Sequence, residues 1–247
     1  MSGAIVCIGG GGFLLDDTRG LQERYILSLL RQRAAAPRVL FLGTASGDGE
    51  RAQLKFMRLF TQLGCRPDTL AFFPYDMKRD YARAVRDADL VYVGGGNTVG
   101  MLAVWREFAF DADLRAAWDD GTVLAGVSAG ANCWFAEYVT DSVPGGGIRA
   151  GLGWVPGTFC PHLDSEAWRQ PILADVPARP GYGAPDGVLL RFEDGHCAEA
   201  VTDHAGREAV RVDTSGVQAT LPTRLLTGLD HSAGGGHATP AEVTIPS

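Results

Sequence analysis

Several features that mark special classes of protein are absent from this sequence. No segment reaches the roughly 18 uninterrupted apolar residues of a membrane-spanning helix, and the amino terminus lacks the basic segment of a secretory signal. Basic residues form no run, and 22 lysines and arginines against 29 acidic residues give a net charge of −7. Nucleic acids and anionic membranes bind through basic surfaces, so neither is expected as a partner.

Cysteine is also sparse. The chain has five cysteines, an odd number, at wide spacing and without a C-x-x-C pair. Such a pattern indicates neither a disulfide framework nor a structural zinc site. We therefore expect a cytoplasmic protein whose thiols stay reduced.

Glycine, in contrast, is abundant. The 33 glycines are about twice the usual share, without the period of three found in collagen, and 46% hydrophobic residues argue against a disordered chain. Five clumps of glycine lie at 9–12, 94–96, 126 with 130, 145–147 and 234–236. Clumped glycine is typical of loops in which the backbone bends sharply or approaches a ligand closely.

Apolar runs of strand length alternate with helix-length segments in the first half of the chain. The runs expected to be strands are 4–8, 38–43, 69–73, 89–94 and 122–127. The segments expected to be helices are 17–33, 50–64, 77–87, 97–119 and 129–138. This alternation predicts βαβ units and an α/β fold, a three-layer sandwich around a mostly parallel sheet.

The pattern changes beyond residue 140. A glycine-rich turn is followed by one short helix expected within 164–176, and then by short antiparallel strands. These strands are expected at 188–192, 197–201, 209–213 and 217–221. With no repeat and no sign of a second domain, we expect one α/β domain over residues 1–227 and a poorly ordered tail at 228–247.

One motif carries chemistry: Gly126-Val127-Ser128-Ala129-Gly130 fits G-x-S-x-G. It follows a predicted strand and precedes a predicted helix, which is the setting of a nucleophile elbow, where a tight turn raises a serine hydroxyl above the sheet edge. The alternative is a glycine-rich packing turn with an incidental serine. The position of the motif between a predicted strand and a predicted helix favours Ser128 as a nucleophile.

A serine nucleophile needs a base, and the chain has five histidines. His231 and His237 fall in the expected tail, while His196 and His204 lie in polar turns. His162 differs because it follows an apolar run at the end of an expected strand, directly after a proline. We therefore expect His162 to be the general base, the alternative being a buried structural histidine.

The base in turn needs a carboxylate to fix its tautomer. Asp186 lies in a Pro/Gly-flanked loop just before a strand, Asp164 makes H-x-D with His162, and Asp141 lies in the turn after the expected elbow helix. The residues alone do not choose among these three.

The oxyanion of acyl transfer needs preorganised donors. The backbone N–H of Ala129 is one candidate, and a second is expected from Gly95 or Gly96 in the loop after the fourth strand. Asn97 either contacts the substrate there or caps the next helix. Nucleotide binding is disfavoured, because neither the 94–96 loop nor the 9–12 loop completes G-x-G-x-x-G.

Together, YVGGGNT at 92–98, AGVSAGA at 125–131 and CPHLDSE at 160–166 resemble the S51 serine peptidases, the family of aspartyl dipeptidase (peptidase E) and cyanophycinase. The resemblance extends from the first strand to about residue 200. It implies a fold like that of class I glutamine amidotransferases, with a Ser-His-acid site. The family nucleophile falls on Ser128, its histidine on His162, and its acid, usually Glu, on Asp186. Asp164 is the second choice, because the amidotransferase relatives use H-x-E.

The resemblance also implies a substrate class. Peptidase E cleaves short peptides after an amino-terminal aspartate and holds its carboxylate with an arginine downstream of the histidine. Arg169 is the approximate match, and its alternative is an exposed helix arginine; Glu166 is a candidate for holding the free amine of the substrate. The expected activity is that of a dipeptidase for aspartyl-type peptides, or of a cyanophycinase-like exopeptidase.

Two other interpretations stay open. An α/β-hydrolase-type esterase also carries G-x-S-x-G, and its order of nucleophile, acid and histidine would make Asp141 the acid. The other interpretation is a small-ligand-binding module without turnover. No metal and no organic cofactor are expected, and the sequence leaves both a monomer and a homodimer open.

Overall fold

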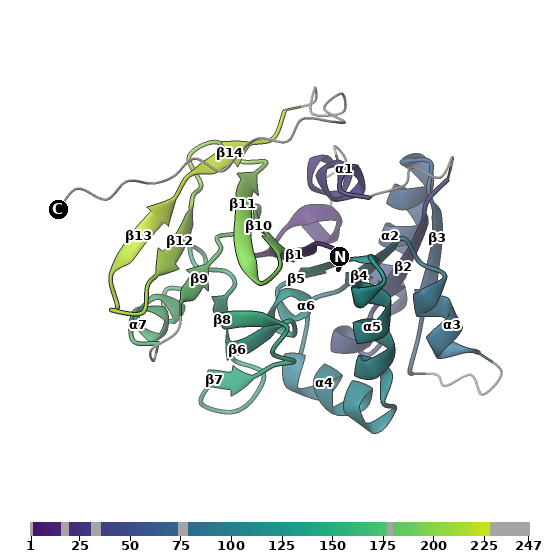
Figure 1. The fold of residues 1–247 in the computed structure, drawn as a ribbon, viewed down its shortest axis with the longest axis horizontal. Helices are drawn as coiled ribbons and strands as arrows, with labels where there is room; N and C mark the ends of the chain where they lie inside the picture. The colour runs from purple at the N-terminus through teal and green to yellow at the C-terminus, as the bar shows by residue number, and fades with distance from the viewer. Residues whose placement is uncertain (1, 16–19, 31–35, 74–78, 177–179, 228–247) are drawn as a thin grey trace.

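The computed structural model describes residues 2–15, 20–30, 36–73, 79–176 and 180–227. Two β-sheets form its framework, one of eight strands and one of six. In Figure 1 helices α1 to α5 gather around the first sheet, and the second sheet lies beside helix α6 and strand β10, with α7 packed against it. The expected tail at 228–247 lies outside the described residues.

The centre of the first sheet is parallel. It contains β1 (Ile5–Ile8), β2 (Arg38–Leu42), β3 (Arg66–Leu70), β4 (Leu90–Val93) and β5 (Val123–Val127). They run side by side in the order β1-β5-β4-β2-β3 with parallel pairing throughout. Most of these strands are apolar along their whole length because both faces are covered, as the sequence predicted.

Later strands extend this sheet beyond β1. They are β10 (Val188–Glu193), β11 (His196–Thr202) and β14 (Thr223–Leu225). β10 is antiparallel to both of its neighbours, β1 and β11, whereas β14 pairs in parallel with β11. The expected antiparallel pairing of the strands at 188–192 and 197–201 is confirmed.

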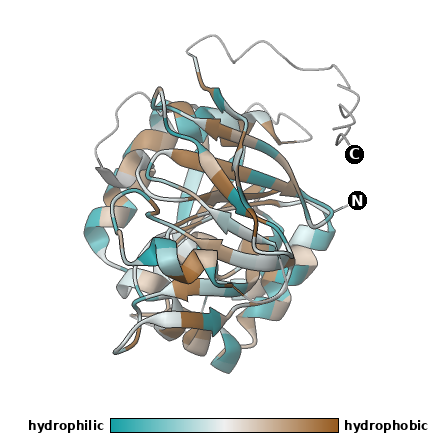
Figure 2. Cartoon of the chain, turned by 90° about the vertical axis from the view of Figure 1, so that its left-hand side faces the viewer, coloured by the Kyte–Doolittle hydropathy of each residue, from teal (hydrophilic) through white to brown (hydrophobic). Residues whose placement is uncertain are grey.

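Helices cover both faces of the first sheet. One face packs against η1 (Gly12–Leu15), α1 (Leu21–Ser28) and α2 (Glu50–Gln62). The opposite face packs against α3 (Tyr81–Arg86), α4 (Thr98–Glu107) and α5 (Phe110–Asp119), and also against the second sheet. Figure 2 shows the hydrophobic segments concentrated in the interior strands and the hydrophilic ones on outer segments.

The second sheet was not predicted. It contains β6 (Phe135–Thr140), β7 (Gly147–Ala150), β8 (Val155–Cys160), β9 (Gly181–Gly183), β12 (Ala209–Val212) and β13 (Gln218–Leu221). Their order is β13-β12-β9-β8-β6-β7, with parallel pairing only around β8. The protein is thus an α/β protein with mixed, largely parallel sheets. Within the second sheet, the expected antiparallel pairing of 209–213 with 217–221 is confirmed.

Three expected elements were wrong in extent. The helix expected at 129–138 ends as α6 (Ala129–Asn132), and the chain then enters β6. The helix expected at 97–119 divides into α4 and α5, because Ala109 takes a left-handed conformation with φ of 51° that no continuous α-helix accommodates. The strand expected at 69–73 is instead β3, which begins three residues earlier.

The remaining helices agree with expectation in position. α1, α2 and α3 lie within the segments expected at 17–33, 50–64 and 77–87, although residues 16–19, 31–35 and 74–78 lie outside the described part. The short helix expected within 164–176 is α7 (Arg169–Ala174). Among the described residues, every helix is too short or too polar to cross a bilayer.

Candidate active site

Ser128 lies in a sharp turn between β5 and α6. Its φ of 54° and ψ of −111° belong to neither a strand nor a helix. Two glycines make this turn possible, since a Cβ on Gly126 would lie 2.0 Å from the carbonyl oxygen of Gly130, and a Cβ on Gly130 would lie 2.3 Å from that of Val93. The turn has the strand-to-helix geometry of a nucleophile elbow.

His162 meets this serine from the second sheet. It follows β8 by two residues and has a positive φ of 55°. Its Nε2 lies 2.8 Å from Oγ of Ser128, and its Nδ1 lies 2.6 Å from Oδ1 of Asp186. The three side chains, called the triad below, therefore form a continuous hydrogen-bonded chain. In it the imidazole can accept the hydroxyl proton while the carboxylate accepts from Nδ1–H.

The loop that carries Asp186 joins β9 of the second sheet to β10 of the first. The Asp186 N–H donates to Oδ1 of Asp164 over 2.9 Å, and the Arg207 guanidinium donates to the Asp186 carbonyl oxygen. Arg207 also lies 3.6 Å from Oδ2 of Asp164. Asp164 thus accepts a hydrogen bond from the backbone of the loop that carries Asp186. The third candidate carboxylate, Asp141, pairs with Arg169 instead.

Sequence reasoning gave no role to Gly10, which the structure places behind the triad. A Cβ on this residue would lie 2.0 Å from Oδ1 of Asp186 and 2.7 Å from Cε1 of His162. Its carbonyl accepts from the Gly187 N–H over 2.8 Å, and the neighbouring Gly9 N–H donates to Val188 over 3.0 Å. The available signal was the position of the first glycine clump directly after β1, at the same sheet edge as the elbow.

The second glycine clump lies beside the serine. A Cβ on Gly95 would be 3.5 Å from Cβ of Ser128, so this backbone borders the reactive hydroxyl. Gly96 packs against the Ala45 carbonyl with a φ of 139°. None of the turn, loop and cap hydrogen bonds among the described residues uses the N–H of Gly95 or Ala129.

Asn97 is occupied by local structure. Its side-chain oxygen accepts from the Gly100 N–H over 2.7 Å and caps α4, while its Nδ2 donates to the Ser142 carbonyl over 2.9 Å. The capping alternative therefore describes the observed contacts of this side chain.

Arg169 is buried, so the alternative of an exposed helix arginine is wrong. Its side chain is 4% exposed. Nε donates to Glu166 over 2.8 Å, Nη1 donates to the Val139 carbonyl over 2.9 Å, and Nη2 lies 3.5 Å from Asp141. The Trp168 ring lies 4.4 Å from the guanidinium. This cation joins two carboxylates and a backbone carbonyl.

Glu166 connects this cluster to the triad. Its backbone N–H donates to the His162 carbonyl over 3.0 Å, while its carboxylate accepts from both Arg169 and Trp168. The cluster therefore braces the turn that presents His162. Both residues proposed for substrate recognition already have protein partners here.

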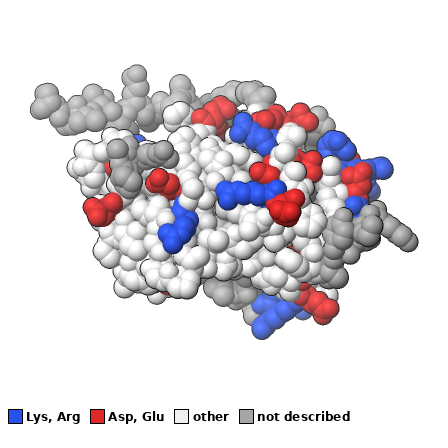
Figure 3. All heavy atoms as spheres, turned by 90° about the horizontal axis from the view of Figure 1, so that it is seen from below, with Lys and Arg blue, Asp and Glu red and all other residues white. Residues whose placement is uncertain are grey.

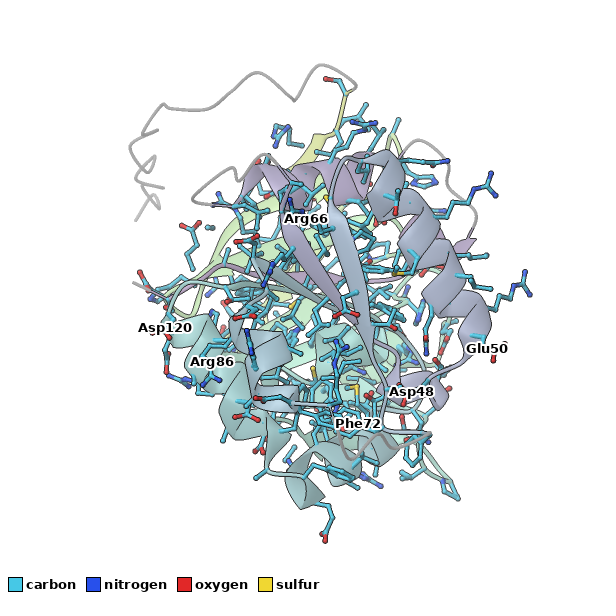
Figure 4. All side chains as sticks on the ribbon, turned by 90° about the vertical axis from the view of Figure 1, so that its right-hand side faces the viewer. Asp48, Glu50, Arg66, Phe72, Arg86 and Asp120 are labelled. Atoms are coloured by element: carbon cyan, nitrogen blue, oxygen red, sulfur yellow. The ribbon has the colours of Figure 1, made fainter. Side chains whose placement is uncertain are left out.

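Other features of the described chain lie away from the triad. No three side chains of His, Cys, Asp or Glu come close enough in the described part to hold a metal ion. A cavity of about 440 Å³ opens near the amino ends of β2 and β3, beside Arg38 and Arg66. Figure 4 shows Arg66 at that end of β3, with Asp48 and Phe72 at the other. On the face drawn in Figure 3, basic and acidic side chains are interspersed.

Comparison with protein families gives one match over most of the chain. The model described as "Peptidase family S51" matches residues 5–200. This span includes Ser128, His162 and Asp186, together with both glycine loops that border them.

Two curated relatives agree with this match. A Bacillus subtilis protein described as "Uncharacterized peptidase YgaJ" is 39% identical over 212 residues, covering 84% of this chain and 91% of the relative. A Citrobacter koseri protein named "Peptidase E" is 30% identical over 154 residues, covering 54% of this chain and 67% of the relative.

Two solved structures share the fold. A peptidase from an acI-B1 Actinobacterium has a TM-score of 0.69 at 20% identity, with 90% of this chain and 95% of that chain covered. A putative peptidase E from Listeria monocytogenes EGD-e has a TM-score of 0.58 at 14% identity, with 90% and 100% covered.

Proposed function

The chain belongs to peptidase family S51 and is a serine peptidase of that family, and we propose that it is a dipeptidase that releases the amino-terminal residue of short peptides through an acyl-enzyme on Ser128. The observation that carries this proposal is the chain of contacts from Ser128 through His162 to Asp186, at 2.8 and 2.6 Å. No other arrangement among the described residues joins a hydroxyl, an imidazole and a carboxylate at such a turn.

The proposed reaction follows from this geometry. His162 accepts the hydroxyl proton through Nε2 as Oγ of Ser128 attacks the peptide carbonyl carbon. Asp186 stabilises the resulting imidazolium through its contact with Nδ1. The imidazolium then protonates the leaving amine, and a water molecule activated by the same imidazole hydrolyses the acyl-enzyme.

We assign the oxyanion to backbone donors. The Ala129 N–H directly follows Ser128 at the start of α6, and the second donor would be an N–H of Gly95, which borders Ser128, or of its neighbour Gly96. Each such donor lowers the barrier by on the order of 3 kcal/mol when it is preorganised. Glycine at 95 leaves the space above the hydroxyl free of a side chain, which favours this assignment.

The amino-terminal residue of the substrate is the finer part of the proposal. Similarity to a protein named Peptidase E favours an aspartyl-type residue. If Arg169 held the aspartyl carboxylate, it would have to exchange a partner such as Glu166 for the substrate. A cyanophycinase-like exopeptidase uses the same nucleophile and is distinguished by its substrate alone.

The two other interpretations receive less support. An α/β-hydrolase-type esterase would need Asp141 beside the histidine, whereas Asp141 is 68% exposed and pairs with Arg169. A binding module without turnover does not need an imidazole held between a serine and a carboxylate.

A dipeptide panel tests the proposed function. Purified protein is assayed with Asp-X, Glu-X and neutral dipeptides, and with a simple ester, alongside Ser128→Ala. We expect peptide hydrolysis that falls by at least about 1,000-fold in Ser128→Ala, because the nucleophile is removed. Wild-type turnover by Ser128→Ala would overturn the assignment, and hydrolysis of the ester alone would favour the esterase.

A further inference from the structure

A second carboxylate–imidazole pair lies next to the loop of the triad acid. Nδ1 of His204 is 2.6 Å from Oδ1 of Asp203. The Asp203 side chain is 1% exposed, whereas that of His204 is 47% exposed. The other oxygen of Asp203, Oδ2, is buried and has no hydrogen-bond partner among the described residues. Among the described residues, the His204 imidazole is therefore the one hydrogen-bond partner of the buried Asp203 carboxylate.

The pair is in direct contact with the residue that follows Asp186. A Cβ on Gly187 would lie 2.5 Å from Nδ1 of His204 and 2.8 Å from Oδ1 of Asp203. Glycine at 187, with its φ of 80°, thus allows the backbone of the acid loop to rest against both side chains. We therefore expect a movement of either side chain to shift the backbone of Gly187, the residue that follows Asp186.

The turn that carries the pair also bonds this loop. The Gly187 carbonyl accepts from Oγ1 of Thr202 over 3.0 Å and from the Asp203 N–H over 3.4 Å. Arg207, four residues beyond Asp203, donates to the Asp186 carbonyl oxygen. The loop is therefore held by the end of β11 and its following turn on one side, and by Gly10 on the other.

From these contacts we propose that Asp203 and His204 are positioning residues, a pair that sets the place of the Asp186 carboxylate against His162. The proposal rests on the proposed function, because it assigns Asp186 as the triad acid. A buried carboxylate that loses its donor moves toward water or draws another donor to itself. Because Gly187 touches both members of the pair, the Asp186 loop would move with them.

Other charged side chains also contact the loop that carries Asp186. Asp164 and Arg207 contact the backbone of the loop that carries Asp186, and His162 contacts the Asp186 carboxylate. Within the described part of the chain, neither Asp203 nor His204 contacts Ser128, so neither is a catalytic residue. We therefore expect their effect to reach the reaction through the position of Asp186, which is what the proposal asserts.

The test is a double-mutant cycle read by the reactivity of Ser128. His204→Ala, His204→Asn and Asp203→Asn are made in the wild-type and in the Asp186→Ala background. Reaction with a fluorophosphonate is followed at several probe concentrations, which separates the maximal rate from the half-saturating concentration without a known substrate. His196→Ala is the matched control, since His196 is an exposed histidine at the start of β11.

We expect His204→Ala to lower the maximal rate by about 10- to 100-fold at an unchanged half-saturating concentration, because a small displacement of a catalytic group has effects of this size. The same substitution should cost nothing further in Asp186→Ala. His204→Asn should restore most of the rate, since its amide can donate from near the position of Nδ1. His196→Ala should react like the wild type.

Two results would overturn the proposal while leaving the triad intact: a His204→Ala rate within about 2-fold of wild type, or an equal loss in both backgrounds. If Asp186→Ala itself reacts at the wild-type rate, the assignment of Asp186 fails and the positioning role fails with it. If Asp203→Asn fails to fold, the double-mutant cycle is still complete, because it can be run with the His204 variants and the side chain of His204 is half-exposed.

Discussion

Ser128 and His162 both have positive φ values, 54° and 55°, and face each other across a 2.8 Å contact. Residues with a Cβ rarely adopt this region, and such strained positions gather at functional sites. The glycines around them have the opposite role, because they remove side chains where backbones must approach. At the scale of single residues, the proposed site therefore depends as much on absent Cβ atoms as on the side chains of Ser128, His162 and Asp186.

Gly10 gives the sharpest prediction at this scale. In Gly10→Ala the new methyl group would lie 2.0 Å from Oδ1 of Asp186 and 2.7 Å from Cε1 of His162, so the contact between these two side chains must be displaced. We expect the fluorophosphonate reactivity of Ser128 to fall by about 100-fold or more while the far-ultraviolet circular dichroism is retained.

Gly49→Ala is the matched control for this substitution. Gly49 has a φ of −60°, and its Cβ would meet only the Ser46 carbonyl, at 3.6 Å. It should leave the reactivity unchanged. A Gly10→Ala protein as reactive as this control would contradict the packing described behind the triad.

The sequence predicted single residues where a local pattern carries the chemistry. Ser128 follows from its motif and context, and His162 from elimination among five histidines. The residues alone did not separate Asp186, Asp164 and Asp141, because only the pairing of distant strands decides which carboxylate reaches the imidazole. It was the family resemblance that favoured Asp186. The position of the first glycine clump indicated the same sheet edge, but the packing role of Gly10 was out of reach, since its neighbour Asp186 is 176 residues away in the chain.

At the scale of elements, a buried carboxylate joins two loops at the carboxyl end of the first sheet. Oδ2 of Asp48, after β2, accepts the N–H groups of Phe72 and Phe73, after β3, the latter over 2.7 Å. Figure 4 shows Asp48 and Phe72 close together at this end. The same loop carries Ala45, whose carbonyl accepts the Asn97 N–H over 2.8 Å. Asp48 thus fixes a loop that supports the glycine loop beside Ser128.

Asp48 also predicts a pH dependence of stability. Burial raises its pKa above the ordinary value of 3.8, against the opposing effect of the Phe73 and Phe72 N–H groups. The folded state therefore holds this proton more tightly than the unfolded state. The free energy of unfolding should fall as pH rises from the ordinary value through the raised pKa, and the contribution is lost above it.

Urea denaturation between about pH 4 and pH 7 measures this effect in the wild type, Asp48→Asn and Asp48→Ala. Relative to Asp48→Asn, which keeps an oxygen acceptor but does not titrate, the wild type should lose stability as pH rises. Asp48→Ala should be less stable than Asp48→Asn by about 1–3 kcal/mol, because it leaves the N–H groups without their acceptor. A pH-independent difference between wild type and Asp48→Asn would refute the linkage.

Elements were predictable where burial follows a local pattern. The apolar parallel strands and amphipathic α2 met that condition. β6 did not, since its aromatic residues are buried by β8 and the first sheet, partners that lie far away in the sequence. β3 pairs only with β2 and keeps charged residues, so the apolar run after it drew the prediction three residues too far. β9 has the sequence Gly-Tyr-Gly, which is too short for an alternating pattern and contains two glycines, a residue depleted in strands.

At the scale of the whole molecule, the triad is assembled from both sheets. Ser128 directly follows a strand of the first sheet, His162 follows a strand of the second, and Asp186 lies where the chain passes from the second to the first. One continuous hydrophobic cluster holds the sheets together, and it includes Ile5 and Leu190 of the first with Phe135 and Phe159 of the second. The fold and the site are therefore coupled through this shared core.

The most direct test identifies the residue that reagents modify covalently and measures how this modification depends on Ser128 and His162. Wild-type protein is treated with a fluorophosphonate and with a slowly turned-over peptide ester, and the modified residue is identified by mass spectrometry of the digested protein. We predict one adduct, on the peptide that contains Ser128, which disappears in Ser128→Ala and forms at least about 100-fold more slowly in His162→Ala. Folded wild-type protein without an adduct, or an adduct on another residue that persists in Ser128→Ala, would contradict the account.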